Sequence, residues 1–252
     1  MSFIECAGLG HRYESALGQS NQALSAVSLS IQAGEFVCLL GPSGCGKTTL
    51  LNLLAGFLSP SEGQLSVGGL PVRGPSPQRG VVFQDYSLFP WLTVADNVAF
   101  GLRMKGLSAA QCSTVVASHL ALVGLESAAR RYPFELSGGM KQRVAIARAL
   151  APDPDVLLMD EPFAALDAMT RGSLQEQLLQ IHESQGKTVV FVTHNIGEAI
   201  LLGTRILVLS PNPGRVVEDL KVDLPRPRRR TSTQFNALYE HLTELIGFET
   251  VD

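Results

Sequence analysis

The sequence predicts an α/β protein with a mostly parallel sheet, flanking helices, a small antiparallel β region and a helical insert. Three apolar runs bounded by polar residues, DVLLMD, KTVVFVTH and RILVLS, are typical of parallel strands covered on both faces. Helical stretches lie between these runs, and such an alternation favours a parallel sheet. A chain of 252 residues, 45% of them hydrophobic, is large enough to form a substantial core.

The first elements of this sheet surround a glycine-rich loop. VSLSIQAGEFVCLLG is predicted to form two short β segments with a turn at Ala33 and Gly34, and GKTTLLNLLAGF is predicted to form a helix that ends at Gly56. Residues 59–80 are rich in Pro and Gly, which indicates turns and one short antiparallel strand at 64–67. GVVF then follows as a buried strand.

A helical insert is predicted at about residues 88–150. Apolar residues recur at helical spacing in 93–102 and in 108–123, and a third helix begins at Ser137. This insert separates the half of the chain with the glycine-rich loop from the strands that follow it.

We expect one main domain over residues 1–230 and a C-terminal helix and tail over 231–252, with the helix at 234–246. PRPRRR, residues 225–230, is interpreted as a surface link to that helix. Its arginines are candidates for contact with a membrane surface or a partner protein, although such a run is more often a solvated linker.

Composition argues against several classes of function. The formal charge of −3 and the aromatic content of 6% disfavour nucleic acid as a partner, because phosphate backbones are held by basic surfaces. The four cysteines show neither C-x-x-C pairing nor His neighbours at metal spacing, which disfavours a zinc site or a disulfide framework. The N-terminus lacks a signal-peptide pattern, and no apolar run approaches the roughly eighteen residues of a membrane helix. We therefore expect a cytosolic protein whose membrane role, if any, depends on a partner.

The strongest motif is GPSGCGKT, which matches G-x-x-x-x-G-K-[ST] in full and lies between a predicted strand and a predicted helix. In such a loop, backbone N–H groups surround the β-phosphate, Lys47 reaches the β- and γ-phosphates, and the Thr48 hydroxyl binds Mg²⁺. Thr49 is a candidate for the α-phosphate, and Cys45 is expected to be a small filler. The motif predicts a P-loop NTPase core. Its nucleotide-binding candidates are Gly41, Pro42, Ser43, Gly44, Cys45, Gly46, Lys47, Thr48 and Thr49.

Polar residues end the neighbouring predicted strands. VLLMDEP ends in Asp160, a candidate for holding Mg²⁺ through water, and Glu161, a candidate general base for the attacking water. His194 ends KTVVFVTH and is a candidate for γ-phosphate contact, although a lone His at a strand end is more often structural. Gln84 follows GVVF in the same way, and spacing alone supports a simple turn residue equally well. The catalytic candidates are Lys47, Glu161 and His194.

A second anion site is predicted at FELSGGMKQRVAIARAL. Ser137 is a good N-cap, and Gly138 and Gly139 leave the first turn of the helix free of side chains, so its N–H groups suit a phosphate. Spacing alone does not explain why a chain with one phosphate loop needs a second anion site.

The motifs GPSGCGKT, Gln84, LSGGM, VLLMDEP with ALD, and TH occur in the order of the ATP-binding cassette family, which the chain resembles over nearly its whole length. The resemblance implies the ABC ATPase fold and ATP and Mg²⁺ as cofactors. It also implies a dimer, expected to be a homodimer, in which Ser137, Gly138 and Gly139 of one subunit bind the nucleotide held by the phosphate loop of the other. The second anion site would thus serve the partner's ATP.

The same resemblance assigns roles to three further residues. Asp167 would form the loop that crosses between subunits, Gln84 would sense Mg²⁺ and the γ-phosphate, and Tyr13 would stack on adenine. One departure from the family is Met140, where the signature usually continues with Gln. We expect Met140 to leave the anion site intact and to influence the rate or the dimer contact.

The chain most resembles the ATPase subunits that energise bacterial importers for nitrate, aliphatic sulfonates and taurine. This resemblance rests on GVVFQDYSLFPWLTVADNVAFGL together with LPRPR. This implies an ATPase on the cytoplasmic face of the inner membrane. A transmembrane permease would contact it between Gln84 and Gly101, and a periplasmic binding protein would select a small anionic solute. The aromatic cluster around Trp91 suits a partner's helix, and filling of the chain's own helical insert is the alternative.

A second class of function remains open, that of a soluble ABC ATPase acting in translation or DNA repair. The single cassette and the lack of a long coiled-coil insert disfavour it. A P-loop kinase or GTPase is disfavoured by the LSGG signature and by the absence of an N-K-x-D motif.

Overall fold

A computed structural model describes residues 2–14 and 20–247 of the chain. The chain divides into two compact units, Met1–Pro75 with Thr188–Asp252, and Ser76–Lys187, and each is described by itself. Residues 248–252, the end of the expected C-terminal tail, lie outside the described residues.

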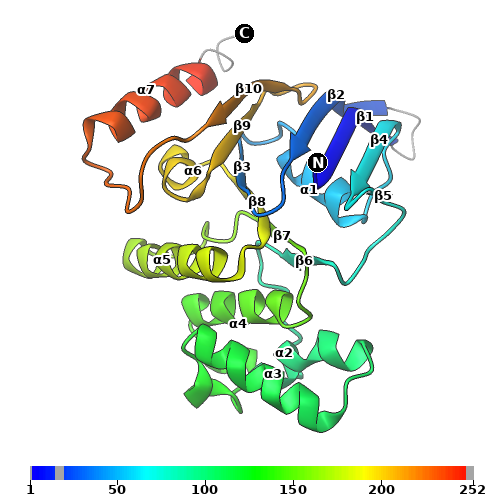
Figure 1. Cartoon of the computed structure of the whole chain (residues 1–252), viewed down its shortest axis with the longest axis vertical. Helices are drawn as coiled ribbons and strands as arrows, with labels where there is room; N and C mark the ends of the chain where they lie inside the picture. The colour runs from blue at the N-terminus through cyan, green and yellow to red at the C-terminus, as the bar shows by residue number, and fades with distance from the viewer. Residues whose placement is uncertain (1, 15–19, 248–252) are drawn as a thin grey trace. The chain divides into compact units, whose positions relative to one another are not determined.

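The first unit contains an antiparallel sheet with the strand order β2-β1-β4-β5 (Figure 1). It confirms the predicted antiparallel β region and its strand at 64–67, and it adds strands on both sides. The strands are β1 (Ile4–Glu14), β2 (Ser20–Ile31), β4 (Glu62–Val67) and β5 (Leu70–Pro71).

The first unit also contains parallel strands. β3 (Phe36–Leu40) pairs in parallel with both β8 (Thr188–Thr193) and β9 (Arg205–Leu209), and all its residues are buried, as its apolar run predicts. β10 (Val216–Lys221) pairs antiparallel with β9. The sequence analysis missed β10, because its alternating VVEDLK pattern is that of a strand with only one buried face.

Three helices belong to this unit, namely α1 (Lys47–Ala55), α6 (Ile196–Leu202) and α7 (Thr233–Gly247). α1 ends at Gly56, as predicted, with the left-handed φ of 84° that favours glycine. α7 packs against α6 (Figure 1) and agrees with the predicted C-terminal helix to within one residue at each end.

The second unit combines two parallel strands with the helical insert. β6 (Arg79–Val82) pairs with β7 (Val156–Asp160), and α4 packs against α2 and α3 (Figure 1). Val98, Leu120 and Val144 are among the buried residues of the core that these helices share. The helices are α2 (Val94–Met104), α3 (Ala109–Leu122), α4 (Gly138–Leu150) and α5 (Ala168–Gln185), with short 3₁₀ turns at Glu126–Ala128 and Pro133–Glu135.

Side-chain caps fix where these four helices begin. Thr93, Ser108, Ser137 and Asp167 each precede a helix in extended conformation and accept a hydrogen bond from a backbone N–H of its first turn. The first three caps explain why the starts of α2, α3 and α4 were predictable to within one residue, whereas the start at Asp167 was not predicted. In the part of the chain that the structure describes, no helix has the length and apolarity required to cross a membrane.

Residues 225–230 form a surface link between β10 and α7, as predicted, with Pro225, Pro227, Arg229 and Arg230 exposed. Arg226 and Arg228 are only partly exposed, and both donate hydrogen bonds to backbone carbonyl groups at the end of α6. Two arginines of this link therefore do more than face solvent, because helix C-termini carry carbonyl groups without intrahelical donors.

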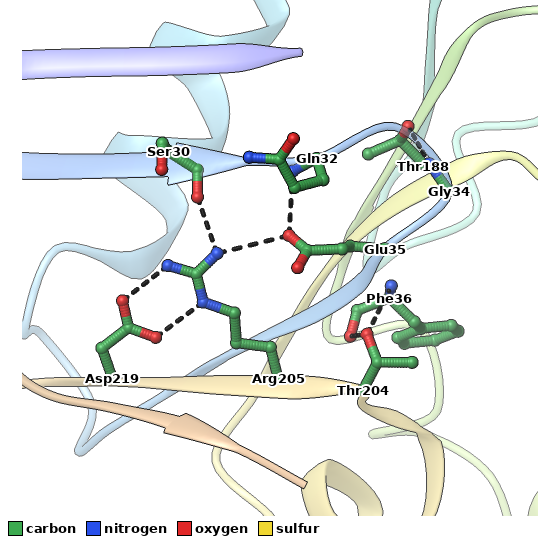
Figure 2. Close-up of polar contacts among 9 residues, drawn as sticks. All are labelled: Ser30, Gln32, Gly34, Glu35, Phe36, Thr188, Thr204, Arg205 and Asp219. Atoms are coloured by element: carbon green, nitrogen blue, oxygen red, sulfur yellow. Dashed lines mark hydrogen bonds and ion pairs between the residues drawn. The ribbon is translucent and has the colours of Figure 1, made fainter. Parts of the chain in front are cut away.

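A largely buried arginine, Arg205, connects the two sheets of the first unit (Figure 2). Arg205 on β9 donates to both carboxylate oxygens of Asp219 on β10, at 2.6 Å each, and to the carbonyl oxygen of Ser30 on β2, at 2.6 Å. The same guanidinium lies 3.3 Å from Glu35, whose carboxylate accepts from the backbone N–H of Gln32 in the β2–β3 turn. Arg205 thereby holds the turn that leads into β3.

We predict that Arg205→Ala lowers the free energy of unfolding by about 2 kcal/mol, because it removes several charge-assisted hydrogen bonds from a side chain that is 18% exposed. Chemical denaturation followed by circular dichroism measures this. Lys221→Ala is the control, since the Lys221–Asp223 pair is largely exposed, and we expect a change below about 0.5 kcal/mol. Equal effects of the two substitutions would contradict the prediction.

Candidate functional site

The GPSGCGKT loop connects β3 to α1 and leaves the first turn of α1 open. α1 begins after Gly46, which has a left-handed φ of 93° and supplies no side chain to cap the helix. Lys47 is 5% exposed, and its Nζ donates to the carbonyl oxygens of Gly41 and Pro42 at 2.8 Å each. The loop therefore presents uncapped N–H groups and one cation, the two features that bind phosphate.

Close packing beneath the loop requires glycine at position 46. A Cβ there would lie 2.6 Å from Cδ2 of Leu24 and 2.8 Å from the carbonyl oxygen of Ala23, both on β2. Gly214 donates its N–H to the same carbonyl of Ala23. The antiparallel sheet thus supports the loop directly, and any side chain at Gly46 would push the loop away from it.

Cys45 fits the interpretation of a small filler. Its side chain is fully buried, and burial raises the pKa of its thiol even though Nζ of Lys47 lies 3.7 Å from the sulfur. A buried thiol with a raised pKa is a poor nucleophile, so its contribution here is packing.

Tyr13 on β1 lies beside α1. Its hydroxyl is 3.2 Å from Oγ1 of Thr49, and the ring of His11 packs edge-on against it with centroids 4.7 Å apart. Tyr13 is 43% exposed, so part of its ring remains available for stacking. Its place near the helix that opens the phosphate loop supports the adenine role that the resemblance implies.

His194 and the phosphate loop both begin at the carboxyl ends of adjacent parallel strands, β8 and β3. In the parallel pairing of β3 with β8, Leu40 lies opposite Thr193, so Gly41 and His194 both follow the last paired residues. His194 is exposed. The first unit therefore brings Tyr13, residues 41–49 and His194 into one region, as the strand-end argument predicted for His194.

Gln84 and the two carboxylates share an edge in the second unit. Val82 of β6 lies opposite Met159 of β7, so Gln84 and Asp160 come at the carboxyl ends of adjacent parallel strands. Glu161 follows in a left-handed conformation with φ 41°. A non-glycine residue held in this region is uncommon and is found disproportionately at functional sites.

The signature lies beside the segment that follows Gln84 and beside the start of α5. Oγ of Ser137 accepts from the backbone N–H of Met140 at 3.3 Å, and a Cβ at Gly138 would be 3.3 Å from the Tyr86 hydroxyl. A Cβ at Gly139 would lie 2.4 Å from Cγ2 of Thr170. Glycine at 139 is therefore required for α4 and α5 to approach each other this closely.

Asp167, a predicted site residue, and Met140, the departure from the usual signature, take structural positions next to the signature. Asp167 caps α5 by accepting from the N–H groups of Met169 and Thr170, at 3.1 and 3.0 Å, and the bond from Thr170 leads the effects that hold the pKa of Asp167 below its usual value. Met140 is partly buried and packs on the helical core. The departure from the usual signature is thus accommodated by packing.

Sequence reasoning missed Arg148, in the last turn of α4. Its guanidinium donates to the carbonyl oxygens of Tyr86 and Ser87, at 2.8 and 2.6 Å, and lies 5.6 Å from the centre of the Phe89 ring. Burial lowers the pKa of this arginine. Tyr86 and Ser87 have left-handed φ values of 64° and 44°, so Arg148 holds a strained turn between Gln84 and Phe89.

Asn97 supports the other end of the same segment and was also missed. It is fully buried on α2, accepts from the N–H of Phe89 at 2.9 Å and donates to the carbonyl groups of Phe89, Leu92 and Thr93. An isolated Asn in an amphipathic helix could have signalled this role, because buried amides need partners.

The aromatic residues after Gln84 divide between core and surface. Phe89 is partly buried and packs against Phe100 with ring centroids 4.5 Å apart. Trp91, the single tryptophan, is 71% exposed and packs on Phe89 from outside, with centroids 5.7 Å apart. Filling of the helical insert therefore accounts for Phe89 but not for Trp91.

The predicted metal ligands suit an ion that is also bound by the phosphate groups of a nucleotide. In the described residues, no group of three or more His, Cys, Asp and Glu side chains could hold a metal ion by itself. An ion at Thr48, Gln84 or Asp160 would need ligands from phosphate oxygens or water, which is how Mg²⁺ usually binds next to nucleotides.

Comparison with known proteins agrees with these features. Residues 24–164 match the family described as ABC transporter. An uncharacterized ABC transporter ATP-binding protein of Methanocaldococcus jannaschii is 51% identical over 86% of this chain and 82% of its own length. The chain belongs to the ABC transporter family, as one of its ATPases.

Some relatives are named for the solute that they transport, and solved structures share the fold. A taurine import ATP-binding protein of Chromobacterium violaceum is 49% identical, over 89% of each chain. A bicarbonate transport ATP-binding protein of Synechocystis is 52% identical over 90% of this chain and 34% of its own length. A dimeric ATP-binding cassette in a post-hydrolysis state, bound to ADP and Pi, superposes with a TM-score of 0.78 at 34% identity, over 88% of this chain and all of that one. The predicted fold class is thereby confirmed.

We predict that Arg148→Met loosens the turn after Gln84, because the Tyr86 and Ser87 carbonyl groups lose their donor. Amide hydrogen exchange at residues 86–89 should become at least about tenfold faster, which corresponds to roughly 1.4 kcal/mol. Arg103→Met on α2 is the control, because its side chain is 51% exposed. Unchanged exchange at 86–89 in Arg148→Met would show that Asn97 alone holds the turn.

Proposed function

We propose that this chain is the ATP-hydrolysing subunit of an importer for a small anionic solute. The observation that carries the proposal is the complete set of motifs in one chain, from the phosphate loop to His194, together with about 50% identity to proteins named for import of taurine and transport of bicarbonate. The solute itself would be selected by other components, a transmembrane permease and a periplasmic binding protein.

Residues of the first unit would hold the nucleotide. The uncapped N–H groups of α1 and Lys47 would bind the phosphates, with Lys47 exchanging the carbonyl oxygens of Gly41 and Pro42 for phosphate oxygens. Tyr13 would stack on adenine. Thr48 would bind Mg²⁺, which would neutralise charge on the phosphates.

Residues of the second unit would carry the hydrolytic step and the partner's nucleotide. Asp160 would hold the metal through water, Gln84 would contact the metal and the γ-phosphate, and Glu161 would accept the proton of the attacking water. Ser137, Gly138 and Gly139 would bind the γ-phosphate of ATP held by a second subunit, and Asp167 would lie at that subunit boundary. ATP would then stabilise the closed dimer, and hydrolysis would release it.

The surface that follows Gln84 would receive the permease. Trp91 is 71% exposed and rests on Phe89, whose backbone is fixed by Asn97 and whose ring lies under Arg148. A rigid exposed aromatic of this kind is a typical anchor for a partner helix. The working location would be the cytoplasmic face of the cell membrane, without a contact to nucleic acid.

We predict that Glu161→Gln retains ATP binding and lowers kcat at least about a hundredfold, since the amide cannot accept the proton. The variant should also accumulate as an ATP-bound dimer in gel filtration. Glu176→Gln, an exposed position on α5, should hydrolyse ATP at the wild-type rate. Wild-type turnover by Glu161→Gln would remove Glu161 from the role of base.

We predict that Trp91→Ala changes the free energy of unfolding by less than about 0.5 kcal/mol, because the side chain is mostly exposed, while recovery of permease from solubilised membranes falls sharply. Mass spectrometry of the co-purified proteins measures the second effect. Tyr239→Ala on α7, also at an exposed aromatic, should retain the permease. Recovery of the wild-type chain with ribosomal or repair proteins instead would favour the soluble class of ABC ATPase.

A further inference from the structure

We propose that Arg226, Arg228 and Arg230 position His194, acting through helix α6, with Arg228 as the principal positioning residue. The inference rests on the proposed function, because it assigns His194 a role in ATP hydrolysis. It concerns a motif that the sequence analysis singled out and that the nucleotide site does not use.

Three arginines of this segment lie against one helix. Arg226 and Arg228 donate to carbonyl groups at the C-terminal end of α6, and a Cβ at Gly197 would lie 2.8 Å from Nη1 of Arg230, near the beginning of α6. Arg229 and Arg230 are both exposed, and Arg229 makes none of these contacts with α6.

Arg228 makes the most extensive contacts of the segment. Its Nη1 donates to the carbonyl oxygens of Ile200 and Gly203, at 2.6 and 2.5 Å, and Nη2 and Nε reach those of Val222 and Leu224, at 3.1 Å each. Burial lowers the pKa of this guanidinium to about 10, which leaves it charged at neutral pH. One cation therefore joins the last turn of α6 to the segment that leads away from β10.

The opposite end of α6 is continuous with His194. Asn195 caps the helix, and its side chain accepts from the N–H of Glu198 at 3.0 Å. The buried hydroxyl of Thr193, the residue before His194, donates to the carboxylate of Glu198 at 2.8 Å and accepts from the N–H of Asn195 at 3.0 Å. His194 thus lies between two residues that are both tied to the first turn of α6.

α6 has seven residues, so the arginine contacts at its last turn lie only about two helical turns from Asn195 and His194. A Cβ at Gly203 would be 3.0 Å from Sγ of Cys38, so the end of α6 also lies directly against β3. Release of the arginine contacts would let α6 shift along β3, and the shift would reach His194 without a change in the phosphate loop. Displacement of a catalytic group by about 1 Å is sufficient to reduce turnover up to about a hundredfold.

The test measures turnover and local dynamics in the full-length chain. Arg228→Ala should lower kcat for ATP hydrolysis by about ten- to a hundredfold with KM for ATP changed less than about twofold, and Arg229→Ala should match wild type. In Arg228→Ala, amide exchange at residues 194–198 should become faster. Arg228→Lys, which keeps the charge but loses the planar fork, should lie between the two.

A double-mutant cycle separates positioning from general stability. If Arg228 acts through His194, then Arg228→Ala should cause little further loss of kcat in a His194→Ala background. Additive losses, or unchanged exchange at 194–198, would overturn the inference. If Arg228→Ala does not fold, the same double-mutant cycle with His194→Ala is measured with Arg226→Ala and with Arg228→Lys. Absence of ATPase activity from the wild-type chain would instead overturn the proposed function, and the exchange measurement would still decide the positioning role.

Discussion

The functional regions of this protein depend on cations that donate to backbone carbonyl groups. Lys47 rests on the carbonyls of Gly41 and Pro42, Arg148 on those of Tyr86 and Ser87, and Arg228 on those around the end of α6. Carbonyl groups in loops and at helix ends have no regular partner, and leaving them buried without a donor is costly. In each place one long side chain provides that donor and fixes the loop as well.

The three cations differ in what can replace them. Lys47 lies in a loop built to bind anions, so phosphate oxygens are better acceptors than its present carbonyl partners. Arg148 and Arg228 have planar guanidinium groups that bridge several carbonyls at once, which a ligand cannot easily displace. Lys47 is therefore suited to exchanging its carbonyl partners for phosphate oxygens, whereas Arg148 and Arg228 are suited to holding the backbone in place. The first unit thus contains a phosphate loop whose lysine can change partners, and each unit contains an arginine that holds its backbone in place.

The sequence predicted most of the fold and the ends of the strands at which the candidate residues lie. Apolar runs marked β3, β7, β8 and β9, and helix-start signals marked α2 to α4, because both signals are local. β10 was missed because a half-buried edge strand resembles a polar loop. Arg148, Asn97 and Arg228 were missed or misassigned because their partners are backbone atoms, which every residue carries and no motif identifies.

The contact of Arg228 with the end of α6 has a consequence for how the sequences of this family can vary. Arg228 contacts main-chain oxygens of Ile200 and Gly203, so substitution of Ile200 by another apolar residue keeps the acceptor. In the pair with Ile200, only the arginine is constrained in chemical type. Paired substitutions would therefore not accumulate between positions 200 and 228, and covariation between these positions in an alignment would not detect the contact. Retention of the arginine, beside a changing residue at position 200, would be the evolutionary trace of such an interaction.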